Sequence, residues 1–130
     1  MELVEQMHGA VKVATVSGRI DQTTAAQFQN LLAPLLVKAK AGAAPLLLDF
    51  SGVDYISSVG LRALMLTARE ARAAGCGLAV AGLQPLVQEI FQISRFDMVV
   101  SLYPTPDAAL EALSSAAAAA HRAAGGTARG

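Results

Sequence analysis

Residues 46–69, LLLDFSGVDYISSVGLRALMLTAR, constrain the fold more than any other stretch of this chain. The stretch begins as an apolar run, breaks at polar residues and then settles into helical spacing. A change from strand-like to helix-like spacing at a polar turn predicts a strand–loop–helix unit. We therefore predict a buried strand over residues 45–50 and a helix over residues 58–73. Two adjacent serines, Ser57 and Ser58, fall where that helix should begin.

The N-terminal part of the chain predicts two strands followed by a helix. Residues 2–16 are rich in valine around a turn signal, which favours a two-stranded start. Asp21 is placed to act as the N-cap of a helix that runs to about Lys40. Pro34 lies inside this helical pattern, so a kink or break is expected near it. Gly42 closes the segment, as a residue that tolerates the left-handed conformation can do.

The C-terminal part continues with strands and helices in alternation. In chain order we expect a strand, a helix, a strand and a helix, at residues 78–81, from Pro85 onward, at 98–102 and at 104–113. Strands separated by helices predict an α/β domain, with a mixed sheet and about four helices packed on it. We expect one domain over residues 1–113. The alanine-rich residues 114–130 are expected to extend the last helix and end as a flexible tail.

Composition excludes several classes of function. Ten basic and ten acidic residues cancel, so the basic footprint of a nucleic-acid-binding protein is missing. No apolar run approaches the ~20 residues of a membrane span, and the N-terminus lacks the order of a secretion signal. The histidines, His8 and His121, lie at opposite ends of the chain and Cys76 is the single cysteine, so we expect no metal and no cofactor. These features indicate a cytoplasmic protein without a membrane partner.

The serine pair was weighed against the nucleophile of a hydrolase. A serine at a sharp strand-to-helix turn is the position of such a nucleophile, but the motif requires Gly-x-Ser-x-Gly. The residues two places before Ser57 and Ser58 are Tyr55 and Ile56. Neither histidine is placed to serve as the base. We therefore predict no catalytic residue, and a protein that is not an enzyme.

Ser58 has two interpretations from its position alone. Its hydroxyl can accept a hydrogen bond from a free N–H of the first helical turn, which is a structural cap worth ~1 kcal/mol. Its position also suits phosphorylation, because the start of a helix carries partial positive charge and tolerates an anion. A phosphate there would place about −1.5 to −2 charges in the path of a docked partner and leave the fold intact.

The segment DFSGVDYISSVGLR resembles the signature of the STAS domain of bacterial anti-sigma factor antagonists. Three further segments match the pattern of that family, namely SGRID, LAVAGLQP and FDMVVSLYPTPDAALEAL, so the resemblance covers about residues 2–113. In that family the regulatory phosphoserine lies two residues before a Gly-Leu pair, which is Ser58 here. Ser57 stands where the familiar form has aspartate and Val59 where it has a small polar residue, so Ser57 is the alternative acceptor.

The resemblance implies a partner-switching function. The unphosphorylated protein would bind an anti-sigma factor that is also a serine kinase of the histidine-kinase-like ATPase fold, and would so release a sigma factor or another target. Phosphorylation of Ser58 would end this binding, and a type 2C-like serine phosphatase would restore it. The residues expected to contact the partner surround the helix start, and they are Asp21, Ser57, Val59, Leu61 and Arg62.

Two other functions remain open at this point. One is a STAS adaptor or structural subunit without a phosphoswitch, for example beside a lipid transport ATPase. The other is a sensor of a small anion or nucleotide that uses the same helix start. Phosphate mapped to Ser58 after incubation with a kinase would favour the switch over both.

Overall fold

A computed structural model describes residues 1–41 and 44–113 of the chain, and Gly42 and the tail 114–130 lie outside the described residues. Its centre is a five-stranded mixed sheet in which strand order follows chain order, β1-β2-β3-β4-β5. The first pair, β1 and β2, is antiparallel and the other pairs are parallel. The strands are β1 Glu2–His8, β2 Val11–Ile20, β3 Leu46–Ile56, β4 Leu78–Ala81 and β5 Ser101–Tyr103. This architecture confirms the predicted α/β fold with a mixed sheet.

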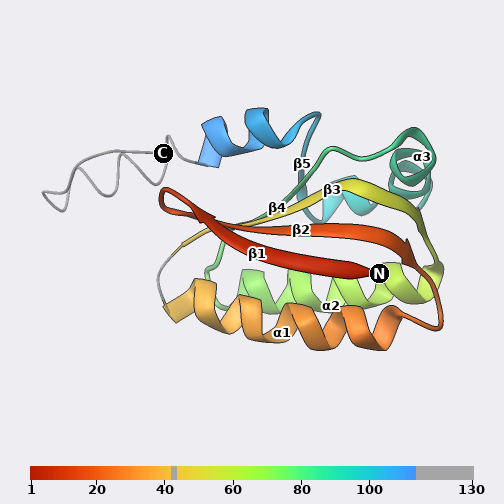
Figure 1. The fold of residues 1–130 in the computed structure, drawn as a ribbon, viewed down its shortest axis with the longest axis horizontal. Coiled ribbons are helices and arrows are strands. Elements are labelled where there is room, and N and C mark those ends of the chain that lie inside the picture. The colour runs from red at the N-terminus through yellow and green to blue at the C-terminus, as the bar shows by residue number, and fades with distance from the viewer. Residues whose placement is uncertain (42–43, 114–130) are drawn as a thin grey trace, which may run out of the picture.

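The helices divide the core into two parts. Helices α1 (Ala25–Ala41) and α2 (Ser58–Ala73) lie side by side along one face of the sheet (Figure 1). The larger core cluster fills the space beneath them, and it also takes Val87 and Phe91 from α3 (Pro85–Ile93). A second cluster on the other face joins Val11 and Leu47 to Ala109, which belongs to a last helical segment at residues 106–113. Alternate strand residues therefore feed opposite sides of the sheet, as a sheet covered on both faces requires.

A line of aromatic rings crosses the larger cluster. Phe28 of α1 meets Phe50 of β3 edge to face at 6.2 Å, and Phe50 meets Phe91 of α3 at the same distance. Phe91 then meets Phe96 at 5.1 Å between ring centroids. Such pairs add about 0.5–1.5 kcal/mol each beyond the apolar area they bury. These ring contacts join α1, β3 and α3 within one core cluster.

Strands β2 and β3 are longer than the sequence predicts. The polar residues after Phe50, expected to form a loop, stay in β3 and pair with β2 through two register shifts. Gly52 permits this pairing, because a Cβ at that position would lie 2.9 Å from the Cβ of Ser17. The extension carries both strands to Ile20 and Ile56, which are paired with each other. The ends of β2 and β3 therefore meet at one place, immediately before α2.

Two other predictions were wrong in detail. Helix α1 runs through Pro34 without a break. Proline removes one backbone hydrogen bond, and it stands here on the exposed side of the helix, where water can satisfy the carbonyl left over. The strand expected at 98–102 is instead a 3₁₀ turn, η1 (Phe96–Met98), followed by the short β5. Arg95 adopts a left-handed conformation with φ 57° and turns the chain there.

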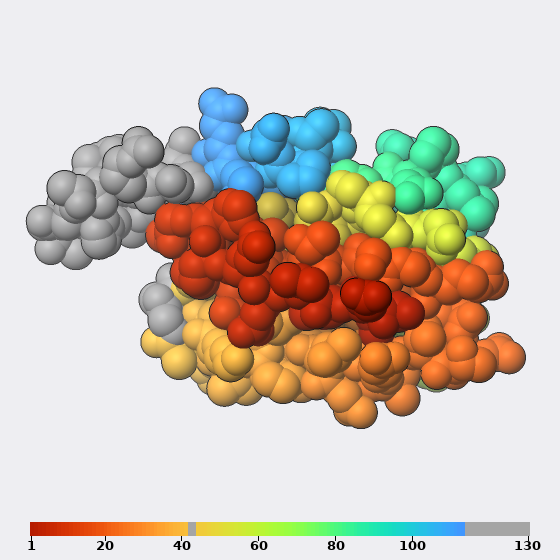
Figure 2. Space-filling view, in the orientation of Figure 1, coloured from red at the N-terminus to blue at the C-terminus, as the bar shows by residue number. Residues whose placement is uncertain are grey.

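The space-filling view shows how the N-terminal half covers the near side of the molecule (Figure 2). Strands β1 and β2 lie across the front, with α1 below them and the segment 106–113 above. Over the residues that the structure describes, no helix is long and apolar enough to cross a membrane.

Candidate functional site

The start of α2 is packed directly against the end of β2. The N–H of Ser57 donates to the carbonyl of Ile20 at 2.8 Å. A Cβ on Gly60 would lie 2.7 Å from Cγ2 of Ile20 and 2.9 Å from Cγ1 of Ile56. The first turn of α2 can therefore approach the strand ends this closely only because residue 60 is glycine.

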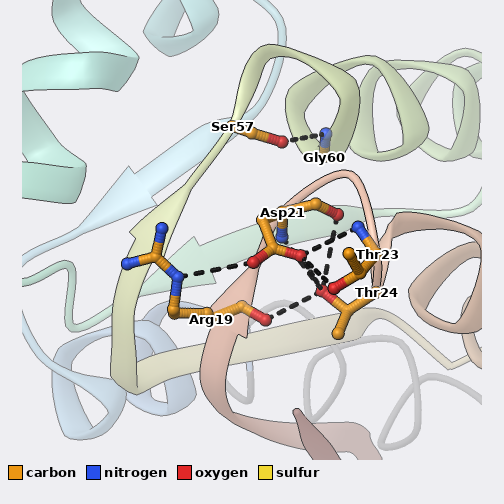
Figure 3. A network of polar contacts seen from close by, with 6 residues as sticks. All are labelled: Arg19, Asp21, Thr23, Thr24, Ser57 and Gly60. Carbon is orange, nitrogen blue, oxygen red and sulfur yellow. Dashed lines mark hydrogen bonds and ion pairs between the residues drawn. The ribbon is translucent and has the colours of Figure 1, made fainter.

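The two serines have different roles at this helix start. Ser57 is the N-cap, with extended backbone (φ −85°, ψ 171°), and its Oγ accepts from the N–H of Gly60 at 3.2 Å (Figure 3). Ser58 is the first residue of the helix and is exposed. Among the described residues its hydroxyl makes no hydrogen bond. The structural cap assigned to Ser58 from the sequence thus belongs to Ser57, because the helix begins at Ser58, one residue earlier than a Ser58 cap would require.

Asp21 holds the neighbouring helix start through reciprocal bonds. Its Oδ1 accepts from the N–H and the hydroxyl of Thr23, at 2.9 and 2.6 Å. In return the Oγ1 of Thr24 accepts from the N–H of Asp21 at 2.9 Å, and the arrangement is that of a capping box (Figure 3). The hydroxyl and N–H of Thr23 lower the pKa of Asp21 from 3.8 to about 2. Asp21 therefore caps the turn over residues 22–24 that leads into α1, one turn ahead of the helix start at Ala25 where the N-cap was expected.

Arg19 links this capped turn to β3. Its Nε donates to Oδ2 of Asp21 at 3.4 Å, and its guanidinium lies 4.4 Å from the centroid of the Tyr55 ring. The cation–π contact was not predicted from the sequence. It requires Arg19 to stand opposite Tyr55, and the register shift between Gly18 and Arg19 produces that pairing. No local sequence signal carries this information, since the shift depends on how two distant strands pair.

Of the other three residues expected to contact a partner, two are exposed and one is buried. Val59 is 47% exposed and Arg62 is exposed, so both face solvent beside Ser58. Leu61 is only 9% exposed and belongs to the larger core cluster. Its place in the core removes Leu61 from the surface that a partner can reach without unfolding the first turn of α2.

The loop after β4 is fixed beside the site by the polar residues of β3. The N–H of Ser51 donates to Oδ1 of Asp49 at 3.0 Å. The side-chain amide of Gln84, the N-cap of α3, donates to the carbonyl of Ser51 at 2.9 Å. Gly82 has φ +74°, and a Cβ on it would collide with Oγ of Ser51. These contacts position α3 on β3.

The geometry gives no support to nucleophilic catalysis. His8, the histidine within the described residues, ends β1 and pairs with Val11 at the beginning of β2. The serines lie beyond the other end of β2, and a strand of this length spans roughly 30 Å. A general base must lie within hydrogen-bond reach of the hydroxyl that it activates. The site is thus an exposed hydroxyl on a rigid, well-capped helix start.

Comparison with known proteins identifies the family. The family model described as "Mlab, STAS domain" matches residues 3–102. BtrV of Bordetella bronchiseptica, a candidate anti-sigma factor antagonist, is 32% identical over 116 residues, which cover 89% of this chain and 97% of BtrV. Rv2638 of Mycobacterium tuberculosis, a candidate anti-anti-sigma factor, is 30% identical over 105 residues, which cover 78% of this chain and 68% of Rv2638.

A solved structure agrees with these relatives. The crystal structure of an anti-sigma factor antagonist from Mycobacterium paratuberculosis superposes with a TM-score of 0.74 at 28% identity, covering 86% of this chain and 92% of the other. The fold is that of a STAS domain. The chain belongs to the STAS-domain family of anti-sigma factor antagonists. The resemblance stated from the sequence is thereby confirmed.

Proposed function

We propose that this protein is a phosphorylation-controlled anti-sigma factor antagonist that works by partner switching in the cytoplasm. In its unphosphorylated form it binds an anti-sigma factor that is also a serine kinase of the histidine-kinase-like ATPase fold. Binding releases the sigma factor or other target that the kinase holds. The observation that carries the proposal is Ser58, a serine that stands exposed at the first position of α2 with its hydroxyl available.

The chemistry of the switch is supplied by the kinase. Ser58 Oγ attacks the γ-phosphorus of ATP, the bond from that phosphorus to the β,γ-bridging oxygen breaks, and ADP leaves. The hydroxyl proton passes to a base of the kinase. A type 2C-like serine phosphatase later hydrolyses the phosphoserine and returns the hydroxyl. In this scheme the protein is a substrate and a ligand and performs no catalysis of its own.

Phosphate on Ser58 favours dissociation for electrostatic and steric reasons. The group adds about −1.5 to −2 charges and three acceptor oxygens at the centre of the contact surface. Its neighbours on that surface are the apolar Val59 and the charged Arg62 and Asp21, all of which the structure leaves accessible. An apolar contact at Val59 cannot form beside a hydrated dianion without a large desolvation cost. The fold itself loses nothing, since Ser58 makes no bond that phosphorylation would break among the described residues.

Ser57 is the weaker acceptor on structural grounds. Its Oγ is occupied as the acceptor for Gly60, and the residue is half-buried between β3 and α2. A kinase would have to release this cap before reaching the oxygen, at a cost of about 1 kcal/mol. We therefore place Ser57 among the residues that shape the contact surface and keep Ser58 as the acceptor.

A reconstitution with the candidate kinase tests the proposal. The protein is incubated with ATP and serine kinases of this ATPase fold from the same genome, phosphate is mapped by mass spectrometry, and binding is measured by calorimetry. We expect phosphate on Ser58 and loss of the complex on phosphorylation. Ser58→Ala should bind and stay bound in ATP, Ser58→Asp should not bind, and Ser57→Ala should still be phosphorylated.

Three outcomes would count against the scheme in different ways. Phosphate on Ser57 would keep the switch and refute the assignment of the acceptor. Binding that is unchanged by Ser58→Asp, with no phosphate on either serine, would favour a STAS adaptor without a phosphoswitch. Saturable binding of a small anion or nucleotide at the α2 start, with no kinase complex, would favour a sensor.

A further inference from the structure

The exposed side of α2 carries a row of arginines that extends well beyond the Ser58 end. Arg62, Arg69 and Arg72 are all exposed. At 3.6 residues per turn, their spacing of seven and three residues keeps them within about 80° of one another around the helix. Across residues 1–41 and 44–113, none of these guanidinium groups takes part in an ion pair. The exposed side of α2 therefore presents three guanidinium groups that no carboxylate of the described residues pairs with directly, and Asp97 is the carboxylate that lines the adjoining hollow.

A groove runs beside this row, between α2 and η1. Its smaller part is a hollow of about 190 Å³, lined by Met65, Ala68, Arg69, Arg72, Met98 and Val99. We call this hollow, together with the larger one that adjoins it, the α2–η1 groove. The larger hollow, of about 670 Å³, shares Ala68, Arg72, Met98 and Val99 and continues to Leu78 and Leu102 at the sheet.

The floor and one wall of the groove are apolar and adaptable. Met98 is 78% exposed, although a methionine side chain gains by burial, and Met65 stands opposite it on α2. Methionines line surfaces that receive the apolar stripe of a helix, because their side chains adjust to different partners. Arg69 and Arg72 follow the α2 wall along the same length. An apolar floor beside a basic wall is complementary to a segment with an apolar stripe and an acidic flank.

We propose that the α2–η1 groove is a second docking surface, and that it takes an acidic amphipathic helical segment of a partner protein. The apolar stripe of that segment covers Met65 and Met98, and its carboxylates pair with Arg69 and Arg72. Charge complementarity carries the choice of partner, since the arginines have no acidic partner in the described part of the chain.

An anionic membrane surface fits the groove less well. Met65 and Val99 are partly buried between α2 and η1, so of these apolar lining residues only Met98 projects, whereas a lipid surface needs a whole apolar face that projects. The chain as a whole has a formal net charge of zero, so no general attraction to such a surface exists.

The groove is separate from the proposed switch. At 1.5 Å per residue along α2, the groove begins at Met65, about 10 Å from Ser58, and extends to Arg72, about 21 Å from it. A partner in the groove can therefore be bound while the Ser58 end is engaged by another protein. The inference goes beyond the proposed function and does not depend on phosphorylation of Ser58.

A synthetic probe tests the surface directly. The probe is a fluorescein-labelled peptide of about 18 residues, roughly five helical turns, with leucine and methionine on one face and glutamate on the other. A matched peptide carries lysine in place of every glutamate. Binding is followed by fluorescence anisotropy, and the bound surface is mapped by amide chemical shifts. We expect saturable binding of the acidic peptide only, with shifts confined to residues 65–72 and 96–102.

Matched variants assign the contacts. Arg69→Glu and Met98→Ser should each weaken binding on the order of tenfold, because each removes a contact at the centre of the surface. Lys40→Glu makes the same charge change on an exposed position of α1 and should leave binding unchanged. Circular dichroism checks that each variant is folded.

Three results would overturn the proposal. Binding of the acidic peptide that Lys40→Glu weakens as much as Arg69→Glu would show nonspecific charge attraction. Shifts centred on Ser57–Gly60 would place the peptide at the switch end. Failure to bind peptide, together with sedimentation on vesicles of phosphatidylcholine with about 30 mol% phosphatidylserine that Arg69→Glu abolishes, would replace the protein partner by a membrane.

Discussion

Helices α1 and α2 begin next to each other at one end of the sheet, and their first turns are stabilised differently (Figure 3). At the start of α1, Asp21, Thr23 and Thr24 satisfy one another through a closed set of hydrogen bonds. At the start of α2, a single bond from Gly60 to Ser57 does the capping and the next hydroxyl stays outside. The polar side chains at the α1 start are thus all used in hydrogen bonds, whereas at the α2 start the hydroxyl of Ser58 stays accessible. The α2 start is tied to the end of β2 by the bond from the N–H of Ser57 to the carbonyl of Ile20, and Ser58 remains exposed.

The largest effect should come from filling the space that lets α2 approach β2. Gly60→Ala places a Cβ 2.7 Å from the Ile20 side chain and 3.0 Å from its carbonyl oxygen. We expect a loss of about 1–3 kcal/mol in the free energy of unfolding, measured with urea. Gly77→Ala is the control, because its Cβ would make only an ordinary contact of 3.5 Å with Pro45. Equal effects of the two variants would contradict the close approach at the α2 start.

The serine pair offers a direct comparison at adjacent positions. Ser57→Ala removes the cap on Gly60 and should lower the free energy of unfolding by about 1 kcal/mol. Ser58→Ala removes an exposed hydroxyl and should change it by less than about 0.5 kcal/mol. Urea unfolding of the two variants side by side measures the difference. A larger loss for Ser58→Ala would return the cap to Ser58 and weaken its proposed role as phosphate acceptor.

Acid should weaken the α1 start through Asp21. Because the folded-state pKa is lowered from 3.8 to about 2, the carboxylate stabilises the fold above pH 3.8. That contribution is lost as the pH falls from there toward 2. Asp21→Asn should therefore show a smaller decline in its urea midpoint over this range than the unmodified protein. Thr23→Val, which removes one donor and keeps the carboxylate, should be intermediate, and identical profiles for all three would rule out the capping box as the cause.

The smallest effect should come from Arg19. Its ion pair with Asp21 and its contact with Tyr55 are both on the surface, and the arginine side chain is 59% exposed. We expect Arg19→Gln to cost less than about 1 kcal/mol in water. The difference from the unmodified protein should shrink further in high salt, since exposed ion pairs are screened. An effect as large as that of Gly60→Ala would mean that the two strand ends depend on Arg19.

The order of strand, loop and helix around the α2 start could be predicted from the sequence. The strand lengths and the capping residue could not, for physical reasons. The change of spacing after Ile56 located α2 to the residue, because helical periodicity continues over several turns. The extent of β2 and β3 was underestimated, since Ser51 and Gly52 are turn formers that the register shifts hold inside a strand. Choosing between Ser57 and Ser58 as the cap required the backbone angles, because both hydroxyls are equally good caps. The Arg19–Tyr55 contact depends on strand pairing that no local pattern encodes.

The sheet order, in which each strand lies beside its neighbours in the chain, has a consequence for synthesis on the ribosome. Each new strand finds an edge that already exists, and no gap has to be kept open for a later segment. The pairing of Ile20 with Ile56 and the cap that Ser57 makes on the N–H of Gly60 involve only residues up to Gly60. The Ser58 end of α2 is thus specified by the first half of the chain, and the groove near β5 by the second. Substitutions in β4, η1 or β5 can therefore alter the α2–η1 groove while the residues at the Ser58 end of α2 stay the same.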